Sequence, residues 1–244
     1  MNETLENAAT APAPKGLAAR FFGIIFSPGE TFKDVVAHPR WFGMLALCTI
    51  AAIVLVGGYL LTSTGQAAWL TQAQASSSMF GRTPSDQQLQ AMAKMAPYAG
   101  YFAAVQMLIF VPLVFVVVAG ICFAIFSAAL GGNATFKQVF AVVVHAGAIG
   151  VLGQLFSMPL NYARGTMTSA TNLGVLLPML SDQSFANHLL SAIDLFLVWQ
   201  ILVLAIGLAV LFKRRTQPVT VAFLSLYGVV AIVIALVRTR FGGA

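Results

Sequence analysis

The sequence predicts an all-α fold: a polytopic helical membrane protein with five transmembrane helices and amphipathic surface helices at its N-terminus. Hydrophobic residues make up 59% of the chain and charged residues 8%, whereas soluble domains carry roughly 25% charged residues. Between Asp194 and Lys213 the chain has no charged residue. At about 1.5 Å per residue, this stretch matches the ~30 Å hydrocarbon core of a bilayer, where a helix satisfies its own backbone hydrogen bonds.

The N-terminal part divides into a tail and a patterned stretch. Residues 1–14 are first acidic and then rich in Ala and Pro, so we expect a disordered tail. Residues 15–40 predict amphipathic juxtamembrane helices. Between Leu17 and Phe26 the apolar side chains cover a broad helical arc, with Arg20 outside it. This run is too short to span a bilayer and predicts a helix on the membrane surface.

A second surface helix is predicted directly after the first. Ser27 is a favourable N-cap, Pro28 suits the first helical position, and Glu30 stands where it can complete a capping box. Phe32 and the valines that follow it form one apolar face. Two interpretations stay open for this face: a membrane anchor, or a docking surface for a cytoplasmic partner.

The membrane domain is predicted for residues 41–240. Its spans are expected at about 41–61, 101–130, 136–158, 194–213 and 219–237. Pro112 predicts a kink in the second span, and Pro159 predicts the end of the third. Residues 216–218 are expected to form a tight turn before the last span.

Smaller patterns describe the connections and one helix contact. Ser85 with Gln88, and Thr135 with Gln138, each predict a capping box at a helix start. The apolar run 173–180 is expected to lie on the membrane surface. Small residues let helices approach closely in lipid, so the glycines of the third span predict a helix contact. These glycines are Gly147, Gly150 and Gly153.

The cations predict the orientation of the chain. Those expected on the N-terminal side of the bundle are Lys15, Arg20, Lys33, Arg40, Lys137, Lys213, Arg214 and Arg215. Those expected on the opposite side are Arg82, Lys94, Arg164, Arg238 and Arg240. Because cytoplasmic connections carry an excess of Lys and Arg, we expect a cytoplasmic N-terminus and an extracytoplasmic C-terminus.

Four polar side chains are expected inside the spans. His145 falls near the midplane of the third span, where an ionisable group suggests proton relay or metal ligation, or else a neutral packed histidine. Gln106, Gln154 and Gln200 fall in the outer halves of their spans. They either bond one another across helices or line a polar path for a solute.

Asp194 stands at the outer boundary of the fourth span, where an acid caps a helix or marks the interface. Arg164 and Arg238 are its expected partners, because both are predicted on the same side of the membrane.

Signatures of catalysis are absent from the sequence. It contains no HExxH, GxSxG, phosphate-loop or CxxC pattern. We therefore expect no enzyme activity, no catalytic or cofactor-binding residue and no metal site. Nucleic acid is not an expected partner, because the cations are few and stand at the ends of apolar runs.

Several segments resemble the bacterial branch of the Yip family, whose name comes from eukaryotic Rab/Ypt-interacting membrane proteins. They are Phe26–Phe32 (FSPGETF), Gly131–Phe136 (GGNATF), Asp194–Trp199 (DLFLVW) and Ala205–Leu208 (AIGL). The resemblance covers about residues 20–237 and follows the family's order of elements. It makes Trp199 a further candidate functional residue.

The resemblance implies a five-span protein with a cytoplasmic N-terminus in the bacterial cytoplasmic (inner) membrane. Eukaryotic members act in membrane traffic by binding partners, although GTPase binding is not carried over to this chain. We expect a non-catalytic membrane scaffold or organiser that binds the lipid bilayer and a protein partner or a second copy of itself. The alternative is a small channel or transporter with a polar path through the bundle.

Overall fold

The structure is a computed structural model that describes residues 13–79, 84–181 and 183–241. The described residues form helices and connecting segments, with one isolated β-bridge and no named strand. The predicted all-α class is therefore confirmed. Arg82 and most of the tail predicted for residues 1–14 lie outside the described residues.

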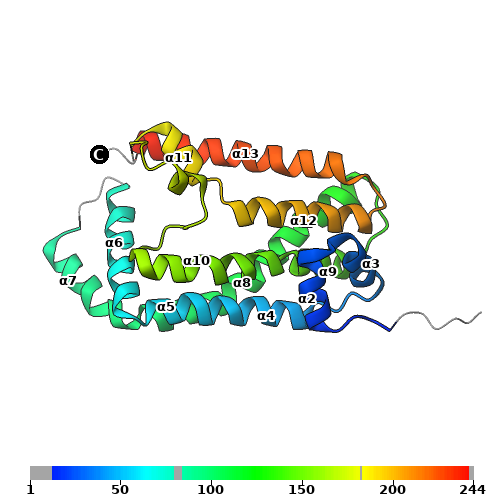
Figure 1. The fold of residues 1–244 in the computed structure, drawn as a ribbon, viewed down its shortest axis with the longest axis horizontal. Helices are drawn as coiled ribbons and strands as arrows, with labels where there is room; N and C mark the ends of the chain where they lie inside the picture. Colours follow the sequence, from blue (N-terminus) through cyan, green and yellow to red (C-terminus); the bar gives the residue numbers. More distant parts are fainter. Residues whose placement is uncertain (1–12, 80–83, 182, 242–244) are drawn as a thin grey trace, which may run out of the picture.

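The long helices lie side by side along the long axis of the molecule (Figure 1). They are α4 (Phe42–Ala52) with α5 (Gly58–Leu60), α8 (Ala99–Phe123), α9 (Phe136–Ala146) with α10 (Ala148–Arg164), α12 (Leu195–Leu211) and α13 (Thr216–Phe241). A π-helical turn at Ile53–Gly57 joins α4 to α5, and another at Ala124–Ala129 extends α8. Helix α2 and the last turn of α13 lie at opposite ends of this bundle (Figure 1).

Shorter helices cover both ends of the bundle. At one end, here named the α2–α3 end, lie α2 (Leu17–Phe26) and α3 (Pro28–Ala37). At the other, named the α6–α11 end, lie α6 (Ser63–Met79), α7 (Asp86–Met95) and α11 (Phe185–Ser191). Short 3-10 segments occupy Ala96–Tyr98 and Leu173–Leu176.

Several helical stretches are long and apolar enough to cross a membrane. Among the described residues there are 4: Phe42–Leu60, Asp86–Ser127, Phe136–Arg164 and Thr216–Arg240. The helix α12 is also apolar but has 17 residues, which makes it shorter than these. The protein is therefore a polytopic helical membrane protein.

Some predicted boundaries are wrong. The helix predicted to end at Pro159 does not end there, because α10 continues through this proline to Arg164, where Gly165 caps it in the left-handed conformation. Residues 216–218 do not form a turn, since α13 begins at Thr216. A proline in the first turn of a helix removes a donor that has no partner there anyway. Pro112 lies inside α8, which continues through it.

Two of the three predicted capping boxes are present in the structure. The capping boxes of Ser85 with Gln88 and of Thr135 with Gln138 are confirmed. The capping box of Ser27 with Glu30 is wrong, because the Ser27 side chain accepts no cap hydrogen bond. The helices α6 and α11 were not predicted, since their sequences are polar or short and lack strong apolar periodicity.

The core of the bundle is centred on α9 and the start of α10, where every residue from Val139 to Ile149 is buried. In the most apolar part of Phe136–Arg164, 72% of the residues are buried, against 17% for Asp86–Ser127 and for Thr216–Arg240. The glycines of this unit lie at helix contacts as predicted: a methyl group at Gly153 would lie 2.9 Å from Phe196 of α12. Small residues thus allow α12 and α8 to approach it closely.

A close approach at Gly207 joins α3 to the bundle. A methyl group there would lie 2.6 Å from Val142 of α9 and 2.8 Å from the Phe32 ring of α3. Phe32 is fully buried. The three helices therefore meet at a point where only a glycine leaves room for the phenyl ring.

Gly207→Ala should destabilise the protein by about 1–3 kcal/mol, because the added methyl group overpacks this contact. The matched control is Gly228→Ala in α13, where no atom lies within 4 Å of the added carbon. That variant should be neutral or slightly more stable, since Ala favours helix over Gly by roughly 1 kcal/mol. Thermal unfolding in detergent measures both, and equal effects would contradict the docking of Phe32 on α12.

Candidate functional site

A buried ion pair holds α2 and α3 together. Arg20 is 2% exposed, and its Nε donates to Asp34 Oδ2 at 2.8 Å. Its other nitrogens donate to the backbone carbonyl of His38 at 3.0 Å and, more weakly, to that of Arg40 at 3.4 Å. One guanidinium therefore joins α2, α3 and the segment that leads into α4.

The Asp34 carboxylate has further partners. Its Oδ1 accepts from the backbone N–H of Lys15 at 3.2 Å and lies 3.5 Å from His38 Nδ1. Buried charges persist in proteins when they are paired and hydrogen-bonded in this way. Arg20 lies outside the apolar arc of α2, yet it is one of the two buried residues of this helix, with Ile24.

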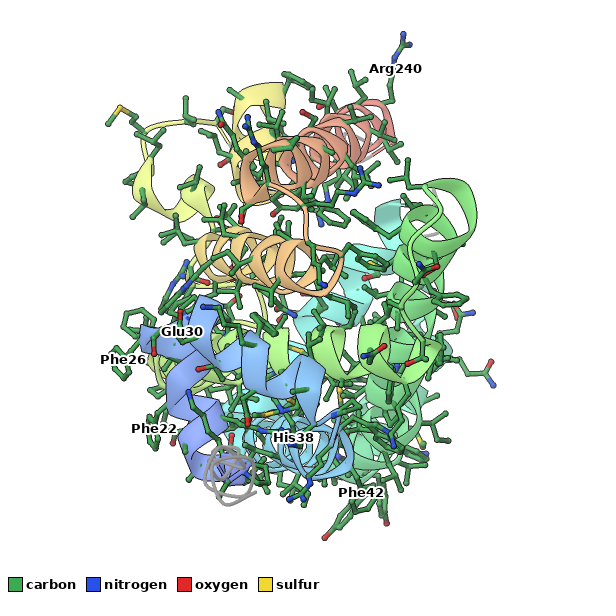
Figure 2. The ribbon with its side chains drawn as sticks, turned by 90° about the vertical axis from the view of Figure 1, so that its right-hand side faces the viewer. Phe22, Phe26, Glu30, His38, Phe42 and Arg240 are labelled. Carbon is green, nitrogen blue, oxygen red and sulfur yellow. The ribbon has the colours of Figure 1, made fainter. Side chains whose placement is uncertain are left out.

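The same hairpin leaves two phenyl rings uncovered. Phe22 is 58% exposed and Phe26 is 81% exposed. Figure 2, which looks onto the α2–α3 end, shows both rings pointing sideways from the body, with Glu30 above them. Exposed aromatic rings at the end of a membrane bundle suit a contact with the membrane interface or with a partner.

The residues of the second predicted surface helix fall into two groups. Pro28 occupies the first turn of α3 as predicted, whereas Ser27 and Glu30 are exposed. Glu30 accepts from Lys33 Nζ at 2.7 Å, and this hydrogen bond together with the lysine charge lowers the pKa of Glu30. Phe32 instead packs into the bundle, so a substitution of Phe32 changes the fold as well as any contact surface.

His145 is fully buried in α9 beneath this hairpin. Its Nδ1 lies 2.7 Å from the Ala141 carbonyl and therefore carries the proton, and its Nε2 has no partner among the described residues. No group of three or more His, Cys, Asp or Glu suited to a metal ion occurs in the part of the chain that the structure describes.

The three predicted glutamines come together. Gln106 of α8, Gln154 of α10 and Gln200 of α12 line one cavity of about 250 Å³, together with Cys48 and Gly150. The Gln154 Oε1 is buried without a partner among the described residues. His145 does not line this cavity. The structure thus groups the amides but separates them from the histidine.

Asp194 caps the N-terminal end of α12. Its Oδ1 accepts from the backbone N–H of Phe196 at 2.9 Å and of Leu197 at 3.1 Å. Its Oδ2 accepts from the hydroxyls of Ser169 and Thr171, the latter at 2.6 Å. The carboxylate is therefore an N-cap that also ties the preceding connection to the helix.

The predicted pairing of Asp194 with an arginine is wrong. Arg164 and Arg238 form no ion pair within the described residues, and hydroxyl and backbone donors surround the carboxylate instead. Partial burial raises the pKa of Asp194, which stands just before α12, but the hydrogen bonds to its ionised form lower the pKa further, to below its usual value. Tyr227 of α13 completes the site, because its hydroxyl accepts from the Asp194 backbone N–H at 3.0 Å.

Trp199 lies one turn further along α12 and is half-buried. It lines an apolar groove of about 330 Å³ with Phe156, Leu176 and Phe196. Its ring centroid lies 6.1 Å from that of Phe196. Trp199 is therefore part of an apolar groove at the α6–α11 end, and no residue of α2 or α3 lines this groove.

The sequence did not predict two contacts: the pairing of Arg20 with Asp34 at the α2–α3 end, and the hydrogen bond of Tyr227 at the start of α12. A lone Arg20 in an otherwise apolar helix is a signal for a buried partner, but the sequence alone does not select Asp34 as that partner. Tyr227 gives no signal, because it is a single tyrosine near the middle of the apolar helix α13, with no pattern that points to Asp194.

Comparison with known proteins gives two matches. The family model described as Yip1 domain matches residues 22–238. The Bacillus subtilis (strain 168) protein named "Membrane protein YknW" is 25% identical over 209 residues, which cover 83% of this chain and 81% of that protein. No solved structure matches the chain.

Asp34→Ala should destabilise the protein by roughly 3 kcal/mol, because it leaves the buried Arg20 without its counter-charge. The matched control is Lys33→Ala, which breaks the exposed pair with Glu30 and should change stability by less than about 1 kcal/mol. Chemical or thermal unfolding in detergent measures the difference. Two equally small effects would show that the Arg20 pair does not hold the hairpin.

Proposed function

Because the chain belongs to the Yip1 domain family, we propose that it is a non-catalytic membrane scaffold that binds lipid and a protein partner through its α2–α3 end. The match to a bacterial protein named as a membrane protein supports a membrane location. The Yip1 domain family is not a known family of enzymes, which agrees with the absence of catalytic patterns in the sequence.

The proposed topology has five spans, with α12 as the fourth in chain order. Its 17 residues extend about 26 Å at ~1.5 Å per residue, close to the hydrocarbon thickness. Asp194 and Lys213 flank it at the two ends. The excess of cations at the α2–α3 end supports a cytoplasmic N-terminus in the bacterial inner membrane and an extracytoplasmic C-terminus.

One observation carries the scaffold proposal: α2 and α3 are fixed on the bundle, yet their outer surface is uncovered. The Arg20–Asp34 pair and the buried Phe32 hold the hairpin in one position. A free surface anchor would need neither contact. Rigid presentation of a surface lowers the entropic cost of binding, which suits a scaffold.

The uncovered surface has two parts with different chemistry. Phe22 and Phe26 point sideways from the bundle (Figure 2), where the proposed topology puts the lipid headgroup boundary. Glu30 and Lys33 of α3 are exposed and charged. We assign the phenyl rings to lipid and the charged side of α3 to a cytoplasmic protein partner or a second copy.

A small channel or transporter is the second candidate function. It is favoured by the cavity that Gln106, Gln154 and Gln200 line between α4, α8, α10 and α12. Polar side chains inside a membrane bundle are enriched on solute paths, although they also bond helices together.

Photo-crosslinking in native membranes tests the scaffold proposal. A photo-reactive residue at position 22 or 26 should crosslink to lipid, and one at position 30 or 33 should give a discrete protein adduct. Position 185 in α11, at the other end, is the matched control and should give no such protein adduct. Label that reacts only with water at positions 22, 26, 30 and 33 would contradict the proposal.

Solute flux in liposomes tests the channel alternative. Scaffold function predicts no flux above that of protein-free liposomes for ions or small polar solutes. If flux occurs, Gln154→Leu should abolish it and Gln138→Leu, outside the cavity, should not. Flux with that pattern would replace the scaffold proposal with a transport function.

A further inference from the structure

A cavity of about 650 Å³ lies at the α6–α11 end, opposite the proposed scaffold surface. Ligand pockets in proteins are typically about 300–1,000 Å³. Helices α6, α10, α11 and α13 and the connection after α10 contribute to its walls. The residues that matter for its chemistry are Arg164, Ser169, Asn172, His188, Ser191 and Arg238.

Among the described residues, the cavity lining is cationic without internal compensation. Arg164 and Arg238 stand in the last turns of α10 and α13, and neither forms an ion pair or a side-chain hydrogen bond among the described residues. The described residues that line the cavity include no acid. Asp194 does not line it, and its oxygens already accept hydrogen bonds elsewhere.

A histidine lines the cavity together with the two arginines. His188 of α11 lines the cavity, and its Nε2 is buried with no partner among the described residues. Burying a polar atom without a hydrogen bond is costly. A ligand that supplies an acceptor would remove this cost.

The cavity wall is held in place before any ligand binds. Ser169 bonds the Asp194 carboxylate, and the Asn172 amide donates to the Ser169 carbonyl at 2.7 Å and accepts from the Val175 N–H at 3.0 Å. The backbone of Leu173 bonds that of Ile193 at 2.9 Å. This connection is therefore fixed against the start of α12.

Helix-end electrostatics do not account for the arrangement. A cation in the last turn of a helix is favoured by the helix dipole, and this explains each arginine separately. It does not explain why the ends of α10 and α13, which are distant in sequence, bring both arginines to one cavity. Arginine presents a planar set of donors that suits phosphate and carboxylate oxygens.

An apolar groove adjoins the same connection. It is the groove of Trp199, Phe156 and Phe196, and Asn172 lines both the groove and the cationic cavity. Leu176, which lines the groove, is 63% exposed. A polar, cationic cavity beside an apolar groove matches a ligand with a charged head and an acyl chain.

We propose that Arg164, Arg238 and His188 bind a phosphate-bearing anion in this cavity. The adjoining groove makes an anionic phospholipid the source that best fits the site, and free phosphate from solution is the other source of the same chemistry. This site is separate from the proposed scaffold surface, so either can fail without the other.

Binding to the full-length protein in detergent tests the proposal, with native mass spectrometry and thermal stabilisation as readouts. The probes are short-chain phosphatidylglycerol, short-chain phosphatidylcholine and inorganic phosphate. Arg164→Gln and Arg238→Gln should each weaken phosphatidylglycerol binding about tenfold, because each removes a charged hydrogen-bond donor. Since neither side chain holds the fold together, both variants should unfold at the same temperature as the parent without ligand.

The matched control is Arg240→Gln. Arg240 lies in the same last turn of α13, does not line the cavity, and points away from the body in Figure 2. Its loss should leave binding unchanged, which separates a site from general charge attraction. Tight binding of phosphatidylglycerol over phosphatidylcholine identifies a lipid site, and binding of inorganic phosphate alone identifies a free-anion site. Equal weakening by all three substitutions, or no binding of any probe, would overturn the proposal.

Discussion

The guanidinium of Arg20 is the point on which the α2–α3 end depends. It is withdrawn from water and joins Asp34 to two backbone carbonyls of the segment before α4. Taking two charges out of water costs several kcal/mol for each ion. Such a pair therefore adds little net stability, but it excludes alternative positions of the hairpin, because any displacement leaves a buried charge without a partner.

The apolar contacts at Gly207 also fix the position of the hairpin. Phe32 inserts where α12 has no side chain, and Val142 of α9 closes the other side. The polar and apolar contacts agree on one position for α3. We interpret α2 and α3 as an integral part of the membrane bundle rather than as a loose tail on its surface.

The fold class follows from composition and from uncharged runs of membrane length, because hydrocarbon leaves a chain few other options. Two capping boxes were also predictable, since their chemistry is local. An N-cap at Asp194 and contacts among Gln106, Gln154 and Gln200 were among the sequence-based expectations, whereas the burial of Arg20 and the hydroxyl donors of Ser169 and Thr171 on Asp194 were not. Each depends on which helix faces which, and in lipid small residues such as Gly150 and Gly207 decide this without a hydrophobic pattern.

The most direct measurement of the central claim is the distance distribution between α3 and the bundle in lipid nanodiscs. Spin labels at positions 30 and 216, both exposed, in a background where Cys48 and Cys122 are replaced by Ala, report it by double electron–electron resonance. A fixed hairpin gives one narrow distribution that broadens in the Asp34→Ala variant. A broad distribution in the parent protein, unchanged by Asp34→Ala, would show that α2 and α3 move freely and would contradict the account.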